Sequence, residues 1–374
     1  MDPAILQKYV QEKKIQKMMI LQKYILKRFF FILTFSLVGV LLFFILSHLV
    51  ENMDRFIDKQ VPLKVVLMYY VYFIPYNLIL VLPVATLLST FFSLGVFAKN
   101  NEIVAMKALG YSLYQIATTL LITGFLISAA SFVISEGIVV KANQRKEGID
   151  QDYLHKSSKI KEARISRLVI QEPPNQIVSI GLYDAGKKEG KHVKIETFGE
   201  NRLICRLDAP SITWNGKSWT IAHGIERFFD EEPEKAIPLD STRTFQFRFT
   251  PDDILLTQEK PEEMGVVELK RFIDLVRSSG GEVQQWLTDY YLRFSFPLSN
   301  LIIILFSIPL AYNQRKNLAI GFFISLGVCF FYFGLVKMGQ TMGEKGSMNP
   351  MIAAWLGNGV LIIGGIINLV KARK

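Results

Sequence analysis

Six long apolar stretches constrain the possible fold of this chain more than any other feature of its sequence. The core of a soluble protein rarely contains such long helices with no charged residue. None of the six contains Asp, Glu, Lys or Arg. They occupy residues 29–50, 65–98, 113–135, 294–312, 318–336 and 351–370. A helix of about 20 apolar residues crosses the hydrocarbon core of a membrane. The stretches therefore predict six transmembrane helices in two groups of three, separated by a long hydrophilic segment.

Basic residues beside these stretches indicate how the chain is oriented. Those that precede the first stretch are Lys8, Lys13, Lys14, Lys17, Lys23, Lys27 and Arg28. Cytoplasmic flanks of membrane helices are enriched in Lys and Arg, so the N-terminus is predicted to be cytoplasmic. An even number of crossings returns the C-terminus to the same side and places the hydrophilic segment on the other. Because the membrane surface accounts for these basic residues, no nucleic-acid partner is expected.

The hydrophilic segment, residues 137–265, has the pattern of a β domain. Apolar and polar residues alternate in Phe245–Phe249, as on a strand with one buried face. Asn215-Gly216 lies between two such runs and is a strong signal for a tight hairpin turn. We expect an antiparallel domain of sandwich or jellyroll type. An amphipathic helix over residues 266–280 would then lead back to the membrane.

Groups that could power transport or catalysis are missing from the predicted spans. An ion-driven carrier normally needs ionisable side chains at mid-membrane depth, and the first three stretches have no Asp, Glu, Lys or Arg. Gly216-Lys217-Ser218 resembles the end of a phosphate-binding loop, but Ser211 stands where its first glycine belongs. The scattered His and Cys residues form no metal-ligand motif. We expect no metal, cofactor or catalytic residue in this chain, and an energy source in another subunit.

A short segment between the second and third stretches, residues 101–112, has the signals of an isolated helix. Asn100 or Asn101 can cap its N-terminus. Glu102 suits the positive end of the helix dipole. Gly110 suits the C-terminal exit, where a left-handed residue is common. We expect a capped helix of about two turns, over residues 100–110, on the cytoplasmic side.

The apolar residues of this short helix suggest a docking surface. Ile103, Met106 and Leu109 are spaced to share one face. An exposed apolar face of this kind can dock in a groove of a cytoplasmic ATPase, as a coupling helix does. A plain interfacial loop is the alternative. Ser112 and Gln115 then form a capping box that begins the third span.

This arrangement resembles the LptF/LptG (YjgP/YjgQ) family of permeases over nearly the whole chain. The family pattern is three spans, a periplasmic β-jellyroll and three more spans. Its best-marked segment, an acidic residue followed by an apolar helix that ends at glycine, is matched by Glu102 to Gly110. Further matches in the second half are residues 293–311, Asn349-Pro350, Ala354-Trp355 and Asn358.

The resemblance implies a fold class, a division into domains and a function. The chain would be a membrane α-helical protein with six transmembrane helices (3+3) and an inserted periplasmic all-β jellyroll domain. Its parts would be an N-terminal membrane half (1–136), the jellyroll (137–265), and a linking helix with the C-terminal membrane half (266–374). As a permease subunit in the bacterial inner membrane, and no enzyme itself, it would extract lipopolysaccharide from the outer leaflet and pass it toward the outer membrane.

The resemblance also implies a set of partners. A paralogous six-span subunit would complete a heterodimer, and a cytoplasmic ABC ATPase dimer would bind the ATP. A single-span jellyroll protein of LptC type and a periplasmic bridge protein of LptA type would receive the lipid. The family contains F-type and G-type subunits, and both assignments stay open.

A site for lipopolysaccharide needs an apolar wall with cations at the level of the headgroups. The candidate cations at the outer ends of the spans are Arg55, Lys59, Lys141, Arg145 and Lys146. Lys64, Arg293 and Lys337 are further basic residues at the outer ends of the spans. If the chain stays helical after the third span, Lys141 and Arg145 share a face. Long basic side chains also anchor helices at the interface, which is the alternative for each of them.

Three other functions compete with lipopolysaccharide export. A permease subunit for another lipid or a lipoprotein keeps the transporter class, but lipoprotein-releasing and macrolide exporters place one span before the large domain rather than three. A membrane scaffold that transports nothing is a second alternative. An intramembrane enzyme is the third, and the spans lack the residues it would need.

Overall fold

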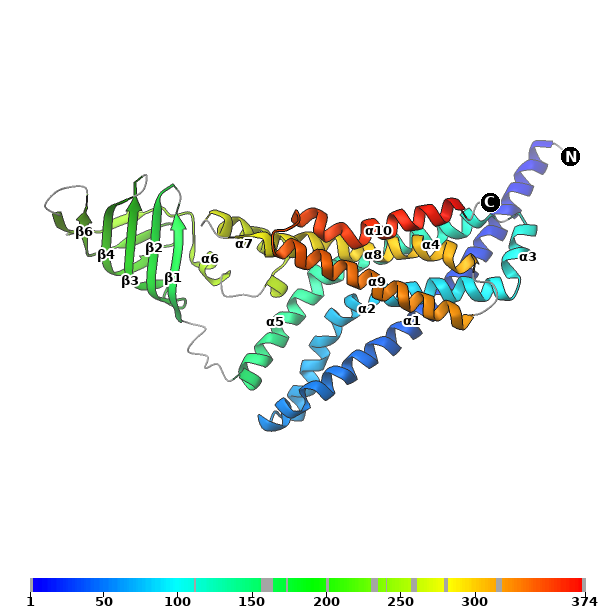
Figure 1. Cartoon of the computed structure of the whole chain (residues 1–374), viewed down its shortest axis with the longest axis horizontal. Helices are drawn as coiled ribbons and strands as arrows, with labels where there is room; N and C mark the ends of the chain where they lie inside the picture. The colour runs from blue at the N-terminus through cyan, green and yellow to red at the C-terminus, as the bar shows by residue number, and fades with distance from the viewer. Residues whose placement is uncertain are drawn as a thin grey trace. The chain divides into compact units, whose positions relative to one another are not determined.

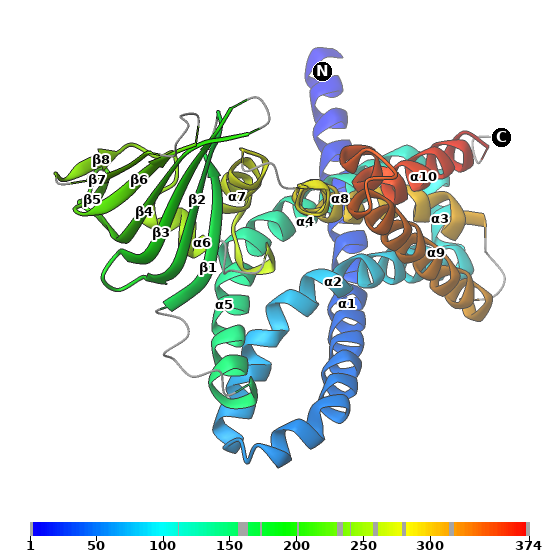
Figure 2. The same cartoon turned by 60° about the vertical axis from the view of Figure 1, so that its left-hand side comes forward.

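The computed structural model describes residues 3–371 apart from residues 111, 156–163, 173, 200–201, 230–234, 240, 257–260, 279–281 and 314–317. In this part of the chain, six helices are long and apolar enough to cross a membrane. The first three begin as α1 (Pro3–Asp58), α2 (Leu63–Lys99) and α4 (Leu113–Ile134), and the last three are α8 (Gln284–Asn313), α9 (Leu318–Glu344) and α10 (Pro350–Lys371). In chain order, an antiparallel β domain separates the two groups, and its strands are drawn in Figures 1 and 2. This arrangement confirms the predicted fold class.

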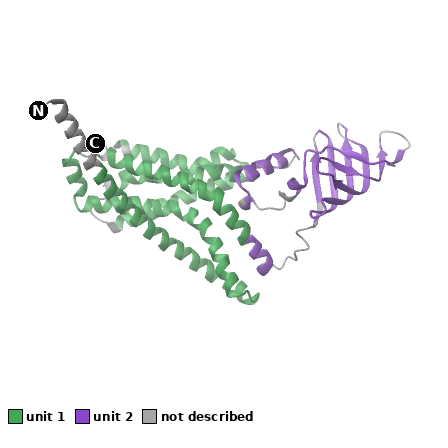
Figure 3. Ribbon diagram, turned by 180° about the vertical axis from the view of Figure 1, so that it is seen from behind, with its two compact units in different colours: residues 1–146, 287–374 green, residues 147–286 purple. Residues whose placement is uncertain are grey.

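The chain forms two compact units (Figure 3). Residues 1–146 and 287–374 make up the first, which we call the membrane unit, and residues 147–286 make up the second, the β unit. Each unit has its own apolar core. The spanning helices come from two distant parts of the sequence and pack together, with α9 beside α10 and α2 beside both α1 and α9.

The third spanning helix continues beyond its apolar stretch. α4 is followed directly by a π-helical segment η1 (Ser135–Val139), by α5 (Val140–Ile149) and by a second π-helical segment η2 (Asp150–His155). The expected start of the β domain at residue 137 therefore lies inside a helix. Residues 137–155 contain no proline, and their buried side chains keep a helical spacing, so nothing local ends the helix there.

The predicted linking helix is α7 (Val266–Ser278), and it belongs to the β unit rather than to the C-terminal membrane half. Its apolar stripe buries Leu269, Phe272 and Ile273, and Leu275 packs against the core of the sheet. An amphipathic helix is stable only when another surface covers its apolar stripe, and here the sheet core provides part of that surface. Gly280-Gly281, the expected end of this helix, lie outside the described residues.

Small residues let the spanning helices of the membrane unit approach one another. A Cβ on Gly321 of α9 would overlap the phenyl ring of Phe91 in α2. On α4, Ser128 Oγ lies 3.3 Å from the backbone nitrogen of Leu301 in α8, and a Cβ on Gly124 would lie 2.7 Å from Ile304 Cδ1. Helices in lipid associate through such close contacts rather than through the hydrophobic effect. Gly124 and Ser128 of α4 and Gly321 of α9 thus pack within this chain.

The β unit contains one curved antiparallel sheet. The strands are β1 (Arg164–Glu172), β2 (Gln176–Asp184), β3 (Glu189–Phe198), β4 (Leu203–Trp214), β5 (Trp219–Ile221), β6 (Gly224–Phe228), β7 (Lys235–Leu239) and β8 (Arg243–Phe245). Strands β1 to β4 pair in sequence order, and the long β4 then pairs with β6 along one half and with β5 at its end. The sheet therefore divides into two branches, β6–β7 and β5–β8 (Figure 2).

The turn between β4 and β5 is the predicted Asn215-Gly216 hairpin. Gly216 has a φ of +96°, which a side chain would strain. The Asn215 side chain accepts hydrogen bonds from the backbone nitrogens of Lys217 and Ser218 at 2.9 and 2.8 Å. These bonds close the turn and place Trp219 in the core of the sheet, where it is fully buried.

The alternating run Phe245–Phe249 is a strand only at its first residue. β8 pairs with β5, and Phe245 lies opposite Trp219, the first residue of β5, so no described strand continues beside the rest of the run. The rings of Phe245, Phe247 and Phe249 are instead stacked, with successive centroids 5.4 and 5.2 Å apart. The sequence pattern correctly predicted that these rings share one side, but not where the ladder of hydrogen bonds ends.

Candidate functional site

The short helix α3 (Glu102–Ala108) lies at the end of the membrane unit where α2 leads into α4 (Figure 1). Its predicted cap is wrong, because Asn101 adopts a left-handed conformation with a φ of +59° and makes no side-chain cap bond. A capping side chain needs an extended backbone at that residue. The predicted left-handed exit at Gly110 is confirmed by a φ of +83°, and Ser112 and Gln115 form the predicted capping box.

The apolar residues of α3 are divided between two faces. Ile103 and Met106 are 3% and 4% exposed and belong to a core built from α1, α2, α4 and α8. Leu109 is 79% exposed and Val104 is 52% exposed. The expectation that Ile103, Met106 and Leu109 share one exposed face is therefore wrong. Ile103 and Met106 are three residues apart and lie on the face of this short helix that covers the end of the bundle.

The carboxylate of Glu102 is held by two groups of this chain. Oε2 accepts a hydrogen bond from the Tyr24 hydroxyl of α1 at 3.0 Å, and Oε1 accepts one from the Asn100 side chain at 2.9 Å. The Tyr24 ring packs on Phe97 of α2 with centroids 5.4 Å apart. The guanidinium of Arg28 lies 5.2 Å from the centroid of the same Phe97 ring. Sequence reasoning missed these contacts, although Tyr24 and Arg28 are one helical turn apart beside the predicted first span.

At the opposite end of α1, the structure places Arg55 and Lys59 on the surface. Arg55 donates a hydrogen bond to Asn52 at 3.2 Å, and Lys59 follows the last helical residue, with its backbone nitrogen 3.3 Å from the Arg55 carbonyl oxygen. The two side chains are therefore one turn apart, as predicted. Lys64, near the start of α2, is also exposed.

The candidate cations after the third span lie on α5, which is helical as the prediction required. Lys141 and Arg145 are exposed and Lys146 is half-buried. The Arg145 guanidinium lies 5.6 Å from the ring centroid of Tyr72, and the Lys146 ammonium lies 6.0 Å from that of Phe73. Such cation–π contacts tie α5 to α2 while leaving the charge able to meet an anion.

Aromatic side chains of α1 and α2 surround the Phe73 position. The His48 ring lies 4.2 Å from Phe73, and His48 Nδ1 lies 3.2 Å from the Tyr70 hydroxyl. Tyr69 and Phe56 pack beside them, with ring centroids 5.6 Å apart. This end of the membrane unit thus combines an aromatic cluster with the cations of α5.

Arg293 of α8 is engaged within the chain. Its guanidinium lies 3.3 Å from the carboxylate of Glu136 in η1, and both side chains are largely buried. The ring of Phe294, next along α8, packs on Phe132 of α4 at 5.6 Å. Lys337 donates a hydrogen bond to Gln340 at 3.0 Å. Arg293 therefore serves first as a contact between the third and fourth spanning helices.

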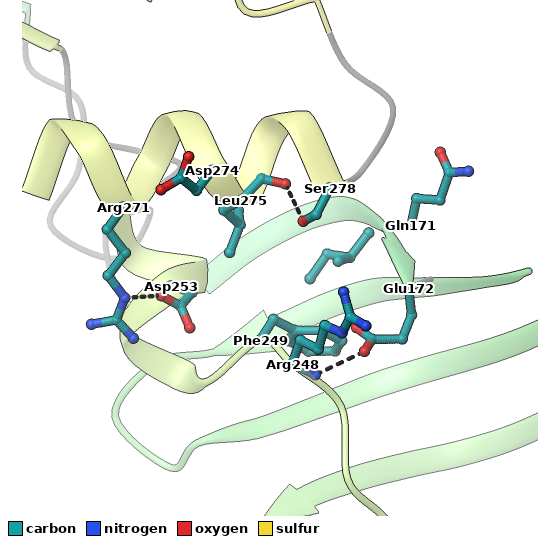
Figure 4. A pocket seen from close by; sticks show the side chains of 10 residues that line it. Gln171, Glu172, Arg248, Phe249, Asp253, Arg271, Asp274, Leu275 and Ser278 are labelled. Carbon is teal, nitrogen blue, oxygen red and sulfur yellow. Dashed lines mark hydrogen bonds and ion pairs between the residues drawn. The ribbon is translucent and has the colours of Figure 1, made fainter. Parts of the chain in front are cut away.

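A cavity of about 210 Å³ lies between β1 and α7 within the β unit (Figure 4). Two bonds connect residues that line this cavity. Arg271 pairs with Asp253 at 2.8 Å, and the backbone nitrogen of Arg248 donates to the Glu172 carboxylate at 2.9 Å. Burial raises the pKa of Glu172. Among the described residues, no group of His, Cys, Asp or Glu is placed to hold a metal ion. We therefore interpret this cavity as part of the packing contact between α7 and the sheet, rather than as a binding site.

Comparison with known proteins decides the family. The model of the family "Lipopolysaccharide export system permease LptF/LptG" matches residues 23–371, which include both groups of spanning helices and the β unit. The chain belongs to the LptF/LptG family. It is similar to the lipopolysaccharide export system permease protein LptG of Escherichia coli K12, with 19% identity over 70% of this chain and 73% of that protein. The LptG protein of Haemophilus influenzae is 20% identical over 72% of this chain and 75% of its own length.

The LptF/LptG assignment fixes the class of the protein. Its members are permeases of the lipopolysaccharide export system, and the six apolar helices agree with a multi-pass protein of the inner membrane. The family model includes α3, the cations of α5 and the Arg293–Glu136 pair within its matched range. These three features are therefore parts of a transporter subunit rather than of an enzyme.

Proposed function

We propose that this LptF/LptG family member is a transmembrane subunit of an ABC transporter that extracts lipopolysaccharide from the outer leaflet of the inner membrane. The lipid then passes along the β unit toward the outer membrane. The observation that carries the proposal is a family match that extends over both membrane halves and the inserted β unit. A second six-span family member completes a heterodimer, and a cytoplasmic ABC ATPase dimer supplies the energy and binds the ATP.

The distribution of charge supports an orientation for this subunit. Both termini and α3 are cytoplasmic, because basic residues flank the α3 ends of the spanning helices. The β unit is then periplasmic, where a single-span jellyroll protein of LptC type and a bridge protein of LptA type take up the lipid. Strand β1 pairs with β2 alone among the described strands, so one edge of the sheet is available for a partner strand.

Helix α1 is the proposed apolar wall for acyl chains. Among its exposed side chains, Phe31, Phe35 and Val50 are 73%, 75% and 70% exposed. Such a row of large apolar side chains is stable only against lipid or another apolar surface. The headgroup phosphates then meet the cations at the periplasmic ends of α1 and α5: Arg55, Lys59, Lys141, Arg145 and Lys146. Arg145 is the strongest candidate, because a guanidinium can bind phosphate through two hydrogen bonds.

The ATPase docks on the exposed face of α3 in this proposal. Val104 and Leu109 supply the apolar contacts of that face. Met106 is buried in the core and holds the helix in position for docking. The groove of the ATPase receives the helix as grooves receive other amphipathic helices. This chain then contributes no catalytic residue and no cofactor site of its own.

Affinity purification in a mild detergent tests the proposed assembly. We expect the tagged chain to recover an ABC ATPase and a second six-span family member in fixed ratio. Reconstituted in proteoliposomes, the complex should hydrolyse ATP faster when lipopolysaccharide is present. A complex stimulated equally by phospholipid alone would point to another lipid substrate, and recovery of the chain without an ATPase would contradict the proposal.

A further inference from the structure

A single carboxylate, that of Glu102, links α3 to α1 by a hydrogen bond. Glu102 accepts one hydrogen bond from the α2–α3 turn, through Asn100, and one from Tyr24 of α1, which precedes it by 78 residues. A phenol donating to a carboxylate forms a charge-assisted hydrogen bond, which is stronger than one between neutral groups. The first residue of α3 is thereby fastened to a helix distant from it in the sequence.

Apolar packing beside this hydrogen bond makes the same connection. Ile25 and Phe29 of α1 are fully buried in the core that also holds Ile103 and Met106 of α3. The Ser89 side chain of α2 donates to the backbone oxygen of Phe29 at 2.6 Å. Because protein cores are close-packed, this contact supports the hydrogen bond in holding α3 against α1.

Helix α1 is built to transmit a displacement of α3. From Tyr24 to Asp58 it contains no proline, whereas α2 contains Pro75 and Pro83. Proline removes a backbone hydrogen bond and kinks a helix, so α1 lacks the usual cause of bending. At a rise of about 1.5 Å per residue, this part of α1 extends roughly 50 Å and includes the exposed apolar wall.

We infer that Tyr24 is a positioning residue, which joins the ATPase-docking helix α3 to the lipid-facing helix α1 through Glu102. The inference rests on the proposed function, since it assigns the mechanical connection between ATP hydrolysis and the wall that holds the lipid. Movement of α3 on the ATPase shifts α1 through the Tyr24–Glu102 hydrogen bond and the core beneath it. Loss of the hydrogen bond leaves docking and hydrolysis intact and reduces the lipid transported by each cycle.

The experiment measures coupling in the full complex, reconstituted in proteoliposomes with lipopolysaccharide. The measured quantity is the ratio of lipopolysaccharide released to a periplasmic acceptor to ATP hydrolysed. Tyr24→Phe removes the hydroxyl and keeps the ring on Phe97. We expect unchanged recovery of the ATPase, unchanged hydrolysis without lipid, and a several-fold lower ratio. A general loss of folded complex would lower release and hydrolysis together and leave the ratio unchanged.

Two further variants separate the hydrogen bond from other effects. Glu102→Gln keeps an oxygen that accepts from Tyr24, so it should retain more of the ratio than Glu102→Ala. Tyr114→Phe removes a hydroxyl that has no hydrogen-bond partner among the described residues at the same end of the unit, and it should match the wild type. Tyr24→Phe added to Glu102→Ala should lower the ratio no further, since both remove one interaction.

The outcomes distinguish this inference from the proposed function. A wild-type complex that hydrolyses ATP and releases lipopolysaccharide, with an equal ratio in Tyr24→Phe, would overturn the inference and leave the proposed function in place. A wild-type complex that shows no lipid-dependent hydrolysis and no release would overturn both.

Discussion

Glu136 and Arg293 place opposite charges where two apolar stretches meet the polar part of the chain. Their side chains are 22% and 15% exposed, and their charged atoms are 3.3 Å apart. Moving a charge out of water costs free energy, which a partner of opposite charge offsets. The pair therefore fixes the position of α8 against η1, and Arg293 is less suited to a lipid headgroup than the exposed Arg145.

Breaking this pair should destabilise the membrane unit. We expect Glu136→Ala to lower the free energy of unfolding by about 1–3 kcal/mol, because the largely buried guanidinium of Arg293 loses the carboxylate of Glu136. Thermal unfolding of the purified protein in detergent measures the change. The reversed pair, Glu136→Arg with Arg293→Glu, should recover part of the loss. Equal losses in the single and the reversed variant would show that the charges are not coupled.

Glu172 should make stability depend on pH in the opposite sense to most carboxyl groups. Burial raises its pKa in the folded protein, so the folded state binds more protons than the unfolded state between the two pKa values. Its contribution to stability is present below the unfolded pKa and is lost as pH rises through the folded pKa. Unfolding of wild type and Glu172→Gln, compared over that range, should show a difference that grows with pH in favour of the variant. A constant difference would contradict the assignment.

At the scale of elements, α3 has two faces with different tasks. Met106→Ala should lower the free energy of unfolding by about 2–5 kcal/mol, because it leaves a cavity in the shared core. Leu109→Asp should leave stability within about 0.5 kcal/mol and prevent recovery of the ATPase, because the side chain is exposed. Thermal unfolding and affinity purification of both variants measure the two effects. Normal ATPase recovery by Leu109→Asp would place the docking surface elsewhere.

The elements themselves could be predicted from the sequence because their signals are local. Six uncharged stretches of membrane-spanning length define six spans, and Asn215-Gly216 defines a hairpin, whatever the rest of the chain does. The end of β8 could not be predicted in this way. It depends on where β5 begins, at Trp219 opposite Phe245, and no pattern within Phe245–Phe249 indicates that position.

The candidate site could be predicted in position but only partly in orientation. The sequence predicted a short helix over residues 100–110, and the structure has one at Glu102–Ala108. The sequence could not say which face of this helix is buried, because that depends on α1, α2, α4 and α8 around it. The Tyr24–Glu102 hydrogen bond joins residues 78 apart and leaves no trace in either local pattern. Hydrophobic spacing identifies an apolar face, while the partner of that face is a property of the tertiary structure.

At the scale of the whole molecule, the chain combines a membrane unit and a β unit that have separate cores. In the membrane unit, helices from both ends of the sequence pack through small residues, whereas α1 leaves most of its apolar surface uncovered. This uneven packing is what the proposed function requires, in which lipid and a second permease subunit cover the exposed surface of α1.

Lipid contact can be tested at the outer end of the assembled complex. We expect photo-reactive residues at positions 141 and 145 to crosslink to lipopolysaccharide, because both side chains are exposed on one face of α5. Arg145→Glu should reduce lipid-stimulated hydrolysis about 10-fold or more, as expected for the loss of a charge-assisted contact, with assembly preserved. Arg145→Lys, the matched control, keeps the charge and should be much milder. Absence of crosslinks, together with normal stimulation in Arg145→Glu, would show that Lys141 and Arg145 only anchor the helix at the membrane interface.

The π-helical segment η1 has a consequence for the direction in which these cations face. A π-turn holds one residue more than an α-turn, so everything that follows is rotated by about 100° relative to an uninterrupted α-helix. Lys141 and Arg145 follow it on α5, and in this register Arg145 lies over the Tyr72 ring. Deleting one residue between Ser135 and Val139 should restore a regular helix and turn Arg145 away from Tyr72. The number of residues in Ser135–Val139, more than their identity, thus sets the direction in which the cations of α5 point.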